Sequence, residues 1–536
     1  MSLSLLSRYA FFALCLLLAL GSVPFLQHEW AWPLALVGGV LSVVGIVDLT
    51  QTRQAVRRNY PVIGNIRYLV EAIRPEIRQY LLEGDREQLP FSRAQRSLVY
   101  ARAKNENASK AFGTLVDVYQ SDFEFINHSI CPAPKADPDS FRVEIGGPQC
   151  TQPYSASIFN ISAMSFGALS ANAIRALNKG ARLGGFAHDT GEGSISTYHR
   201  EQGGDLVWEI GSGYFGCRAA DGSFDPAAFA VQAQQPQVKM IEIKLSQGAK
   251  PGHGGVLPKG KITPEIAATR GVPLGQDCIS PAAHRAFSTP VELLQFIAQL
   301  RELSGGKPVG FKLCLGHAWE FMAIAKAMIE TGILPDFIVV DGKEGGTGAA
   351  PLEFADHFGV PLREGLLFVH NTLVGLNLRD RIKLGASGKI VSAFDIARAL
   401  AIGADWANSA RGFMFAIGCI QSRSCHTNKC PTGVATQDPL RQRALVVEDK
   451  GLRVHNFHRN TMEALAEMLS AAGLTHPSQV NASHLVQRIS PTEVRLYSQL
   501  HVFLKPGELL AGQVEGRFYE RMWAMARADS FEPVSA

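Results

Sequence analysis

The sequence predicts an α/β protein with a (β/α)8 barrel, or TIM barrel, that follows a transmembrane helical hairpin. Two apolar stretches open the chain, and short β-rich runs alternate with helical patterns from about residue 158 to residue 412. Eight alternating units over about 255 residues are typical of this barrel. With 46% apolar and 19% charged residues, the composition disfavours disorder and allows a large core.

The charge balance argues against one broad class of function. Lysine and arginine total 52, and aspartate and glutamate total 48, so the net charge is 52 − 48 = +4 over 536 residues. A chain this close to neutral is not expected to carry a general nucleic-acid-binding surface. Its nine cysteines are too few for a disulfide scaffold.

Residues 1–50 predict the transmembrane hairpin. The apolar stretches Tyr9–Leu26 and Trp30–Val47 are each about 18 residues long, near the lower limit for crossing a membrane. Basic residues lie outside the pair, at Arg8, Arg53, Arg57 and Arg58. We therefore expect an inner (plasma) membrane protein whose catalytic domain is cytoplasmic. The alternative is a signal peptide cleaved near Ala19-Leu20-Gly21.

Residues 51–157 predict a connecting region that is first helical and then irregular. Ile66, Leu69, Val70 and Ile73 recur at helical spacing, and prolines interrupt the remainder. We expect this region to pack on the catalytic domain.

The barrel and a following cysteine loop are expected within residues 158–487, and residues 488–536 predict a C-terminal tail. The strand candidates are Phe159–Met164, Gly185–Asp189, Met240–Leu245, Asp277–Ser280, Val309–Cys314, Phe337–Val340, Ile382–Leu384 and Trp406–Ser409. The helical patterns between them include Ala171–Leu183, Pro290–Leu303, Ala318–Glu330 and Ala393–Ala401. A doubly wound open sheet is the alternative. No G-x-G-x-x-G opens a helix after the first strand, which disfavours a nicotinamide-binding Rossmann fold.

Glycine-rich turns after the late strands predict a phosphate site. Such turns let backbone N–H groups approach phosphate oxygens, and barrels commonly bind phosphate after strands seven and eight. The candidates there are Gly388, Ser409 and Arg411, and the turn after strand six could add Gly345, Gly346 and Thr347. The alternative is that these glycines only form tight turns.

Lysines at strand ends suggest a second anionic partner. Lys312 could stabilise negative charge on a reduced flavin, and Lys244 or Lys250 could bind a substrate carboxylate. Each could instead form an ion pair at the barrel mouth. Together with the glycine turns, these lysines favour FMN over a sugar phosphate.

A cysteine loop follows the last strand. Cys419, Cys425 and Cys430 have the spacing C-x5-C-x4-C, which predicts a metal site. Zinc could use His426 as a fourth ligand, but this residue adjoins Cys425 and would strain a tetrahedral site. An iron–sulfur cluster is therefore favoured, with three irons, or with four irons and an open or foreign fourth ligand.

These motifs resemble the central and FMN-binding part of glutamate synthase over roughly residues 158–487. The matching text comprises Met164-Ser165-Phe166-Gly167, Thr190-Gly191-Glu192-Gly193, Glu242-Ile243-Lys244, Gln247-Gly248-Ala249-Lys250-Pro251-Gly252, Gly345-Gly346-Thr347-Gly348-Ala349, Leu378-Arg379-Asp380-Arg381 and Cys425-His426-Thr427-Asn428 through Cys430-Pro431. The resemblance implies FMN at the C-terminal mouth of the barrel, with a 3Fe-4S cluster that feeds it electrons. It also implies reduction of 2-iminoglutarate, made from 2-oxoglutarate and ammonia, to L-glutamate.

The resemblance assigns roles to individual residues. Cys419, Cys425 and Cys430 match the cluster ligands. The expected catalytic residues are Glu192, Lys250 and Lys312, and the expected substrate-binding residues are Gln247, Lys250 and Arg270. Lys250 and Arg270 can pair with carboxylates, and Glu192 can handle the imine proton or ammonia. The expected cofactor-binding residues are Met164, Ser165, Lys244, Lys312, Gly345, Gly346, Thr347, Gly388, Ser409 and Arg411.

The sequence departs from the family at two levels. A membrane hairpin stands where the large subunit begins with a glutaminase domain, so we expect free ammonia or an ammonia-supplying partner. In the substrate loop, His253 replaces a glutamate and Val256 a glutamine of the family pattern. Because valine cannot hydrogen-bond a substrate, the substrate could be another 2-oxo acid or an amino acid.

Three functions follow from these observations. The first is reductive amination of 2-oxoglutarate or a related 2-oxo acid, with electrons from a separate donor protein. The second is a membrane-bound amino-acid or amine dehydrogenase that passes electrons to an acceptor protein or quinone. The third is a non-catalytic membrane redox sensor, which the retained substrate lysines disfavour.

Overall fold

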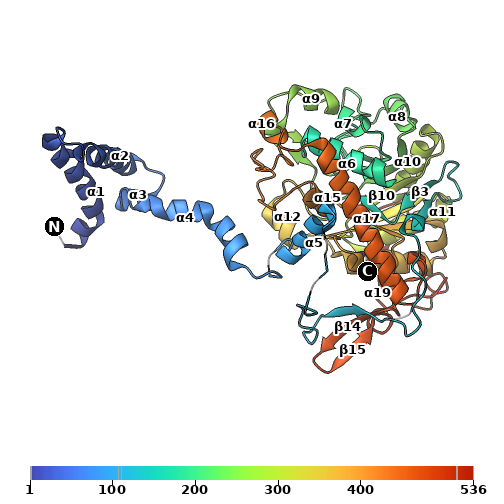
Figure 1. Cartoon of the computed structure of the whole chain (residues 1–536). Coiled ribbons are helices and arrows are strands. Elements are labelled where there is room, and N and C mark those ends of the chain that lie inside the picture. Colours follow the sequence, from blue (N-terminus) through green and yellow to red (C-terminus); the bar gives the residue numbers. More distant parts are fainter. Residues whose placement is uncertain (1–2, 88, 107, 110, 515–516, 535–536) are drawn as a thin grey trace. The chain divides into compact units, whose positions relative to one another are not determined.

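The computed structural model describes residues 3–87, 89–106, 108–109, 111–514 and 517–534. The chain divides into two compact units, residues 1–94 and residues 95–536 (Figure 1). The first unit is helical. Its elements are α1 (Leu3–Ser22), the short helix η1 (Val23–Phe25), α2 (Ala31–Thr50), α3 (Ala55–Asn59), α4 (Gly64–Ile77) and the π-helix η2 (Arg78–Leu82).

Helices α1 and α2 form a tightly packed pair. A Cβ atom on Gly38 would lie 2.6 Å from the backbone nitrogen of Ala19, and one on Gly45 would lie 2.1 Å from the ring of Phe12. Small residues on one face of α2 therefore allow the close backbone approach that is typical of membrane helices. Within the described residues, Arg8–Phe25 and Ala31–Thr50 are long and apolar enough to cross a membrane. Length and composition alone support this assignment.

The second unit contains a closed parallel barrel, which confirms the predicted fold. Each strand pairs in parallel with its neighbour. In barrel order the strands are β4 (Phe159–Ile161), β5 (His188–Asp189), β6 (Leu206–Ile210), β7 (Val238–Lys244), β10 (Val309–Leu313), β11 (Phe337–Asp341), β12 (Lys383–Ser387) and β13 (Trp406–Ser409).

The predicted set of barrel strands is wrong at two places: it omits one barrel strand and includes one strand that lies outside the barrel. The third barrel strand is Leu206–Ile210, which the sequence analysis missed, and Met240–Leu245 corresponds to the fourth. The predicted strand Asp277–Ser280 lies outside the barrel, because β9 (Cys278–Ile279) pairs antiparallel with β8 (Val256–Leu257). The buried Glu209 interrupts the apolar pattern of β6 and hid it from a search for apolar runs.

Helices surround the barrel and bear clear end signals. Ser170 caps the start of α6 by accepting from the Ala173 N–H, and Thr289 and Glu292 form a capping box at the start of α10. The larger helices are α5 (Arg93–Lys104), α6 (Ala171–Gly184), α10 (Pro290–Leu303), α11 (Ala318–Thr331), α13 (Leu362–Gly375), α14 (Ala393–Ile402) and α17 (Val447–Ala471). The shorter ones are α7 (Thr197–Arg200), α8 (Pro226–Ala233), α9 (Pro264–Arg270), α12 (Leu352–His357), α15 (Arg411–Ala416), α16 (Pro439–Gln442), α18 (Tyr497–Leu500) and α19 (Phe518–Met525).

A β-hairpin covers the end of the barrel where the strands begin. It consists of β2 (Arg142–Ile145) and β3 (Tyr154–Ser157). Ile145, Tyr154 and Ala156 pack against residues at the starts of the barrel strands, including Phe337 and Trp406. The opposite end, where the strands finish, carries the polar residues described below, as in other (β/α)8 barrels. A separate small sheet joins β1 (Glu124–Ile126), β14 (Leu485–Ser490) and β15 (Glu493–Leu496).

Candidate active site at the carboxyl ends of the strands

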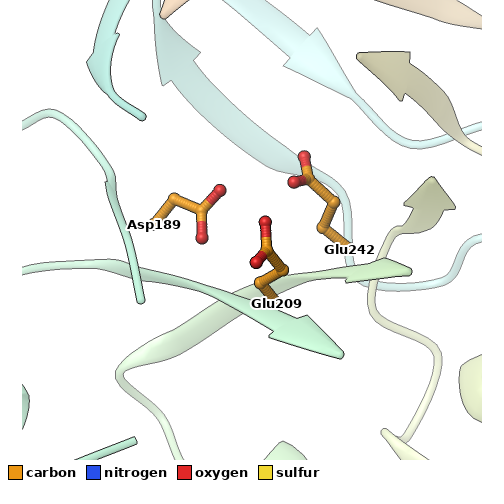
Figure 2. A group of neighbouring side chains, drawn as sticks. All are labelled: Asp189, Glu209 and Glu242. Atoms are coloured by element: carbon orange, nitrogen blue, oxygen red, sulfur yellow. The ribbon is translucent and has the colours of Figure 1, made fainter. Parts of the chain in front are cut away.

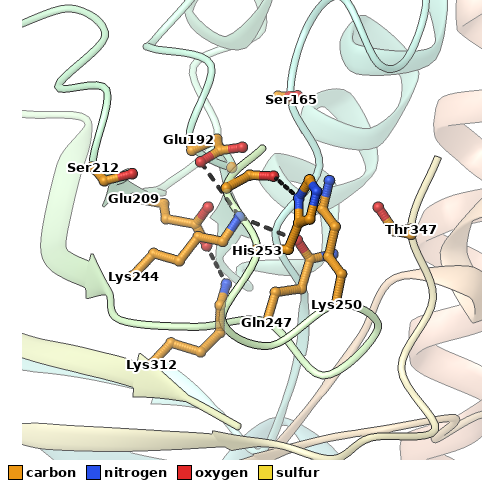
Figure 3. Close-up of polar contacts among 12 residues, drawn as sticks. Ser165, Glu192, Glu209, Ser212, Lys244, Gln247, Lys250, His253, Lys312 and Thr347 are labelled. Carbon is orange, nitrogen blue, oxygen red and sulfur yellow. Dashed lines mark hydrogen bonds and ion pairs between the residues drawn. The ribbon is translucent and has the colours of Figure 1, made fainter. Parts of the chain in front are cut away.

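Glu192 belongs to a charged group at the barrel mouth, where it faces Lys244 (Figure 3). Lys244, the last residue of β7, places its Nζ 3.4 Å from Glu192 Oε2 and 3.1 Å from Gln247 Oε1. Burial would raise the pKa of Glu192, but Lys244, Arg270 and Lys250 outweigh it and hold this pKa below its ordinary value. Glu192 is therefore a carboxylate at neutral pH, surrounded by cations.

Two glycines confine the Glu192 carboxylate. A Cβ atom on Gly211 would lie 2.6 Å from Glu192 Oε2, and one on Gly255 would lie 1.8 Å from Oε1. No other residue type fits at these two positions without moving the carboxylate.

Lys250 and Arg270 are the other two cations of this group, and both are buried. Lys250 Nζ donates to the carbonyl of Ala349 at 3.2 Å, and Arg270 Nη2 donates to the carbonyl of Phe166 at 3.1 Å. Burial, and then the nearby Lys244, lower the pKa of Lys250 to about 8. Both side chains donate to neutral carbonyl oxygens, which a substrate carboxylate could replace with a stronger acceptor.

Lys312 lies inside the barrel and is surrounded by acidic residues. Its Nζ is 3.0 Å from Glu242 Oε1 and 3.8 Å from Asp189 Oδ2, and it also forms an ion pair with Glu209. Figure 2 shows the three carboxylates facing one another, and one ligand oxygen from each lies within 4.8 Å of the others. Lys312 is 3% exposed. We call Asp189, Glu209, Glu242 and Lys312 the barrel charge cluster.

The charges of this cluster do not balance unless protons are bound. Burial, and then Glu242, raise the pKa of Asp189 well above its ordinary value, and burial raises the pKa of Glu242. Burial opposes the charge on Lys312, but the surrounding acids outweigh it and raise the pKa of Lys312 well above its ordinary value. The surroundings therefore favour the charged form of Lys312 and the protonated forms of Asp189 and Glu242.

Sequence reasoning gave no role to the three acids of this cluster. Asp189 was predicted only as the last residue of a strand and Glu242 as part of a matching motif, and Glu209 was missed together with β6. The available signal was a carboxylate within an apolar strand, as in Leu206-Val-Trp-Glu-Ile210. Such a residue is rarely buried without a partner.

The glycine-rich turns after β11, β12 and β13 meet at the same end of the barrel. Arg411 Nη2 donates to the carbonyl of Thr347 at 2.6 Å, and a Cβ atom on Gly346 would lie 2.6 Å from Arg411 Nε. Ser409 Oγ donates to the carbonyl of Ile390 at 2.5 Å, and Gly388 has a φ of 153°. Turns of small residues beside a guanidinium fit a phosphate group.

Met164 and Ser165 approach from the first barrel strand, β4. The Met164 N–H donates to the carbonyl of Asp189 at 3.3 Å, and Ser165 Oγ lies 3.4 Å from Arg270 Nη2. A Cβ atom on Gly191 would lie 2.8 Å from the backbone nitrogen of Ser165. Gly345 lies in the turn after the late strand β11, where an added Cβ atom would be 3.1 Å from the carbonyl of Gly342. The structure thus brings residues from the early and late strands to one mouth.

The cysteine loop adjoins this mouth through Arg411. Arg411 Nη1 lies 3.9 Å from Cys425 Sγ, so one guanidinium contacts both the loop after β11 and a cysteine sulfur. The Gln421 N–H donates to Cys419 Sγ at 3.5 Å. Burial would raise the pKa of Cys430, but the N–H groups of residues 432, 434 and 435 and the Thr432 hydroxyl hold it below its ordinary value. These donors fit metal-bound thiolates.

In the described part of the chain, the one trio of His, Cys, Asp or Glu ligand atoms mutually within 4.8 Å is Asp189, Glu209 and Glu242. The sulfurs of Cys419, Cys425 and Cys430 do not form such a trio.

Comparison with known proteins places this barrel in a family. Its fold and charged mouth define a (β/α)8-barrel enzyme. The family described as "Conserved region in glutamate synthase" matches residues 142–475. The glutamate synthase large subunit-like protein YerD of Bacillus subtilis (strain 168) is 38% identical over 483 residues, which are 83% of this chain and 91% of that protein. The chain belongs to the glutamate synthase family and is a glutamate synthase-like oxidoreductase.

Two further relatives match a smaller part of the chain. The archaeal-type glutamate synthase (NADPH) of Thermotoga neapolitana is 35% identical over 58% of this chain and 59% of that protein. The archaeal glutamate synthase (NADPH) of Methanocaldococcus jannaschii is 36% identical over 59% of this chain and 58% of that protein. The chain thus spans somewhat less than three-fifths of the length of these relatives.

Proposed function

We propose that this chain catalyses reductive amination of 2-oxoglutarate, or of a related 2-oxo acid, to the L-amino acid while anchored in the membrane. One observation carries the proposal: Glu192 is a confined carboxylate at the barrel mouth with Lys244, Lys250 and Arg270 around it. A 2-oxo acid with two carboxylates needs such cations, and an imine nitrogen needs a nearby proton carrier. The family to which the chain belongs supports the same reaction class.

Two redox groups complete the proposal. FMN would bind at the barrel mouth, at residues from the first, middle and late strands and the turns that follow them: Met164, Ser165, Lys244, Lys312, Gly345, Gly346, Thr347, Gly388, Ser409 and Arg411. A 3Fe-4S cluster would bind Cys419, Cys425 and Cys430. When bound, these groups supply the electrons and the hydride for the reduction. Arg411 supports their proximity, because it contacts both Thr347 and Cys425.

The side chains at the mouth divide the remaining work. Lys250 and Arg270 bind the substrate carboxylates, with Gln247 fixed beside them by Lys244. Glu192 holds the ammonium ion or the iminium proton at its carboxylate oxygens. Gly211 and Gly255 keep that carboxylate in one place, so the proton is presented at a defined position.

The test is glutamate formation by purified full-length protein. Reduced protein supplied with ¹⁵N-ammonium and 2-oxoglutarate should give ¹⁵N-glutamate. A Glu192→Gln variant should bind the same amounts of FMN and iron yet lose about 10²- to 10⁴-fold in rate, the usual contribution of a general acid or base. Equal rates for the two proteins would refute the role of Glu192, and no product from the parent would refute this substrate.

The second candidate function is oxidation of an amino acid or amine by a membrane-bound dehydrogenase. The two apolar helices favour it, since they would bring a dehydrogenase close to membrane quinone. His253 also departs from the family pattern: its Nδ1 lies 2.8 Å from the carbonyl of Gly254 and its ring packs edge-on against Phe354. Quinone reduction by membranes with an amino acid, lost in Cys425→Ala, would support this candidate over amination.

A further inference from the structure

Helix α4 carries an exposed apolar face. Ile66, Leu69, Val70 and Ile73 are between 44% and 63% exposed. Leu69 and Val70 follow Ile66 by three and four residues, and Ile73 follows them by four and three, so the four side chains lie on one side of the helix. Tyr80 and Leu81 are also more than half exposed in η2, which continues from α4. An apolar stripe this long on a helix surface indicates a partner.

Arginines accompany the stripe. Arg67, Arg74 and Arg78 are seven and four residues apart, so they form a column along one edge of the stripe. Arg67 pairs with Glu71 at 3.0 Å. Residues 51–82 contain six arginines and two glutamates, a net charge of 6 − 2 = +4. An apolar face edged by arginine is the pattern of a helix that lies on an anionic membrane.

A buried carboxylate ties this helix to the end of α2. Asp48 lies in the last turn of α2 and is fully buried. It accepts from Arg57 Nε at 2.7 Å and from the Val62 N–H at 2.9 Å, and it also accepts from Asn65 Nδ2 at 2.5 Å. The end of α2, helix α3 and the start of α4 therefore form one fixed corner. A membrane that α2 crosses has its surface at this corner.

We infer that α4 lies in the interface of an anionic bilayer, on the side of the membrane where α2 ends. Ile66, Leu69 and Ile73 face the acyl chains, and the arginine column reaches the lipid phosphates. The inference rests on the proposed membrane hairpin, because the corner at Asp48 places α4 at the surface only if α2 spans the bilayer. The competing occupants of the stripe are the catalytic unit and a second copy of the chain.

Tryptophan quenching by brominated lipid tests the inference in the full-length protein. Leu69→Trp, on the stripe, is compared with Tyr68→Trp, a partly exposed position on the opposite side of the same helix. Vesicles contain phosphatidylcholine brominated on its acyl chains, with or without phosphatidylglycerol, and the parent signal is subtracted. We expect a larger loss of fluorescence for Leu69→Trp than for Tyr68→Trp. Phosphatidylglycerol should increase the loss of fluorescence of Leu69→Trp. Adding Arg74→Gln to the Leu69→Trp variant should abolish this increase.

Other outcomes overturn the inference. Equal quenching of the two variants would place α4 away from the bilayer. Protection of Leu69→Trp from aqueous iodide without quenching by lipid would show that protein covers the stripe. A Val40→Trp variant, at an exposed position near the middle of α2, reports on the hairpin separately. If lipid quenches Val40→Trp but not Leu69→Trp, the hairpin stands and the inference about α4 fails. If it quenches neither, the hairpin itself is refuted.

Discussion

At the scale of single residues, the position of the Glu192 carboxylate depends on two glycines. A Cβ at Gly255 would meet Glu192 Oε1 at 1.8 Å, whereas nothing lies within 4 Å of a Cβ at Gly260 in the same segment. We predict that Gly255→Ala displaces the carboxylate and slows amination about 10²-fold, while Gly260→Ala does not. Steady-state rates with 2-oxoglutarate and ammonium check this. Equal rates for the two variants would show that the carboxylate position is not limiting.

The barrel charge cluster gives a second residue-scale prediction. Lys312→Met would leave Asp189, Glu209 and Glu242 buried without their cation, and should cost about 3–5 kcal/mol of unfolding free energy near neutral pH. This loss of unfolding free energy should become smaller as the pH falls. A carboxyl group whose pKa is higher in the folded state than in the unfolded state stabilises the folded state at pH values below its unfolded pKa. That stabilisation is lost as the pH rises through the folded pKa.

Urea unfolding of the variant and the parent between about pH 5 and pH 8 measures this dependence. The double variant Lys312→Met, Glu209→Gln is the control, because it removes one unpaired charge and should recover part of the loss. A pH-independent loss in the single variant would show that packing, and not charge, explains it.

The side chains at the barrel mouth could be predicted from the sequence more easily than the contacts in the barrel interior. Lys244, Lys250 and Glu192 stand in motifs at strand ends, and the structure brings them together. The surroundings of Lys312 could not be predicted, because its acidic partners come from three other strands whose register only the closed barrel fixes. One of those strands, β6, was not recognised at all.

At the scale of elements, helix pairs depend on close approach at small residues. Gly38 and Gly39 are neighbours on α2, but a Cβ at Gly38 would lie 2.6 Å from Ala19, whereas one at Gly39 has nothing within 4 Å. Cys15 of α1 is buried against this face. We predict that Gly38→Val separates the helices and that Gly39→Val does not, because overpacking usually costs about 1–3 kcal/mol.

Alkylation of Cys15 by a small maleimide reports on this separation. In detergent-purified protein, mass spectrometry should show faster modification of Cys15 in Gly38→Val than in Gly39→Val or the parent. The same rate in all three proteins would contradict the packing of α1 on α2.

Element prediction succeeded where local signals are strong. The bounds of four helices were predicted to within a residue or two. Helices α6 and α10 show the reason, because residues that commonly cap helices stand at their starts: Ser170 at α6, and Thr289 with Glu292 at α10. Asp277–Ser280 was predicted as a barrel strand because a short β-rich run does not reveal its partner. Its partner is β8, outside the barrel.

At the scale of the whole molecule, the proposal joins a barrel oxidoreductase to two membrane-spanning helices. If both helices cross the membrane, the barrel lies on the same side as the N-terminus, and the arginines that follow α2 favour the cytoplasm. We predict that a reporter active only outside the cytoplasm is inactive when fused to the C-terminus, while a reporter active only in the cytoplasm works there. The reverse pattern would contradict the hairpin topology.

The cofactor content of the detergent-purified protein tests the central claim most directly. We expect flavin absorption bands over a broad iron–sulfur background, FMN released on denaturation, and iron and sulfide in the ratio of a 3Fe-4S cluster. The Cys425→Ser variant should lose the iron and keep the FMN. Zinc in place of iron, with no flavin, would contradict the claim that this barrel unites two redox groups at one mouth.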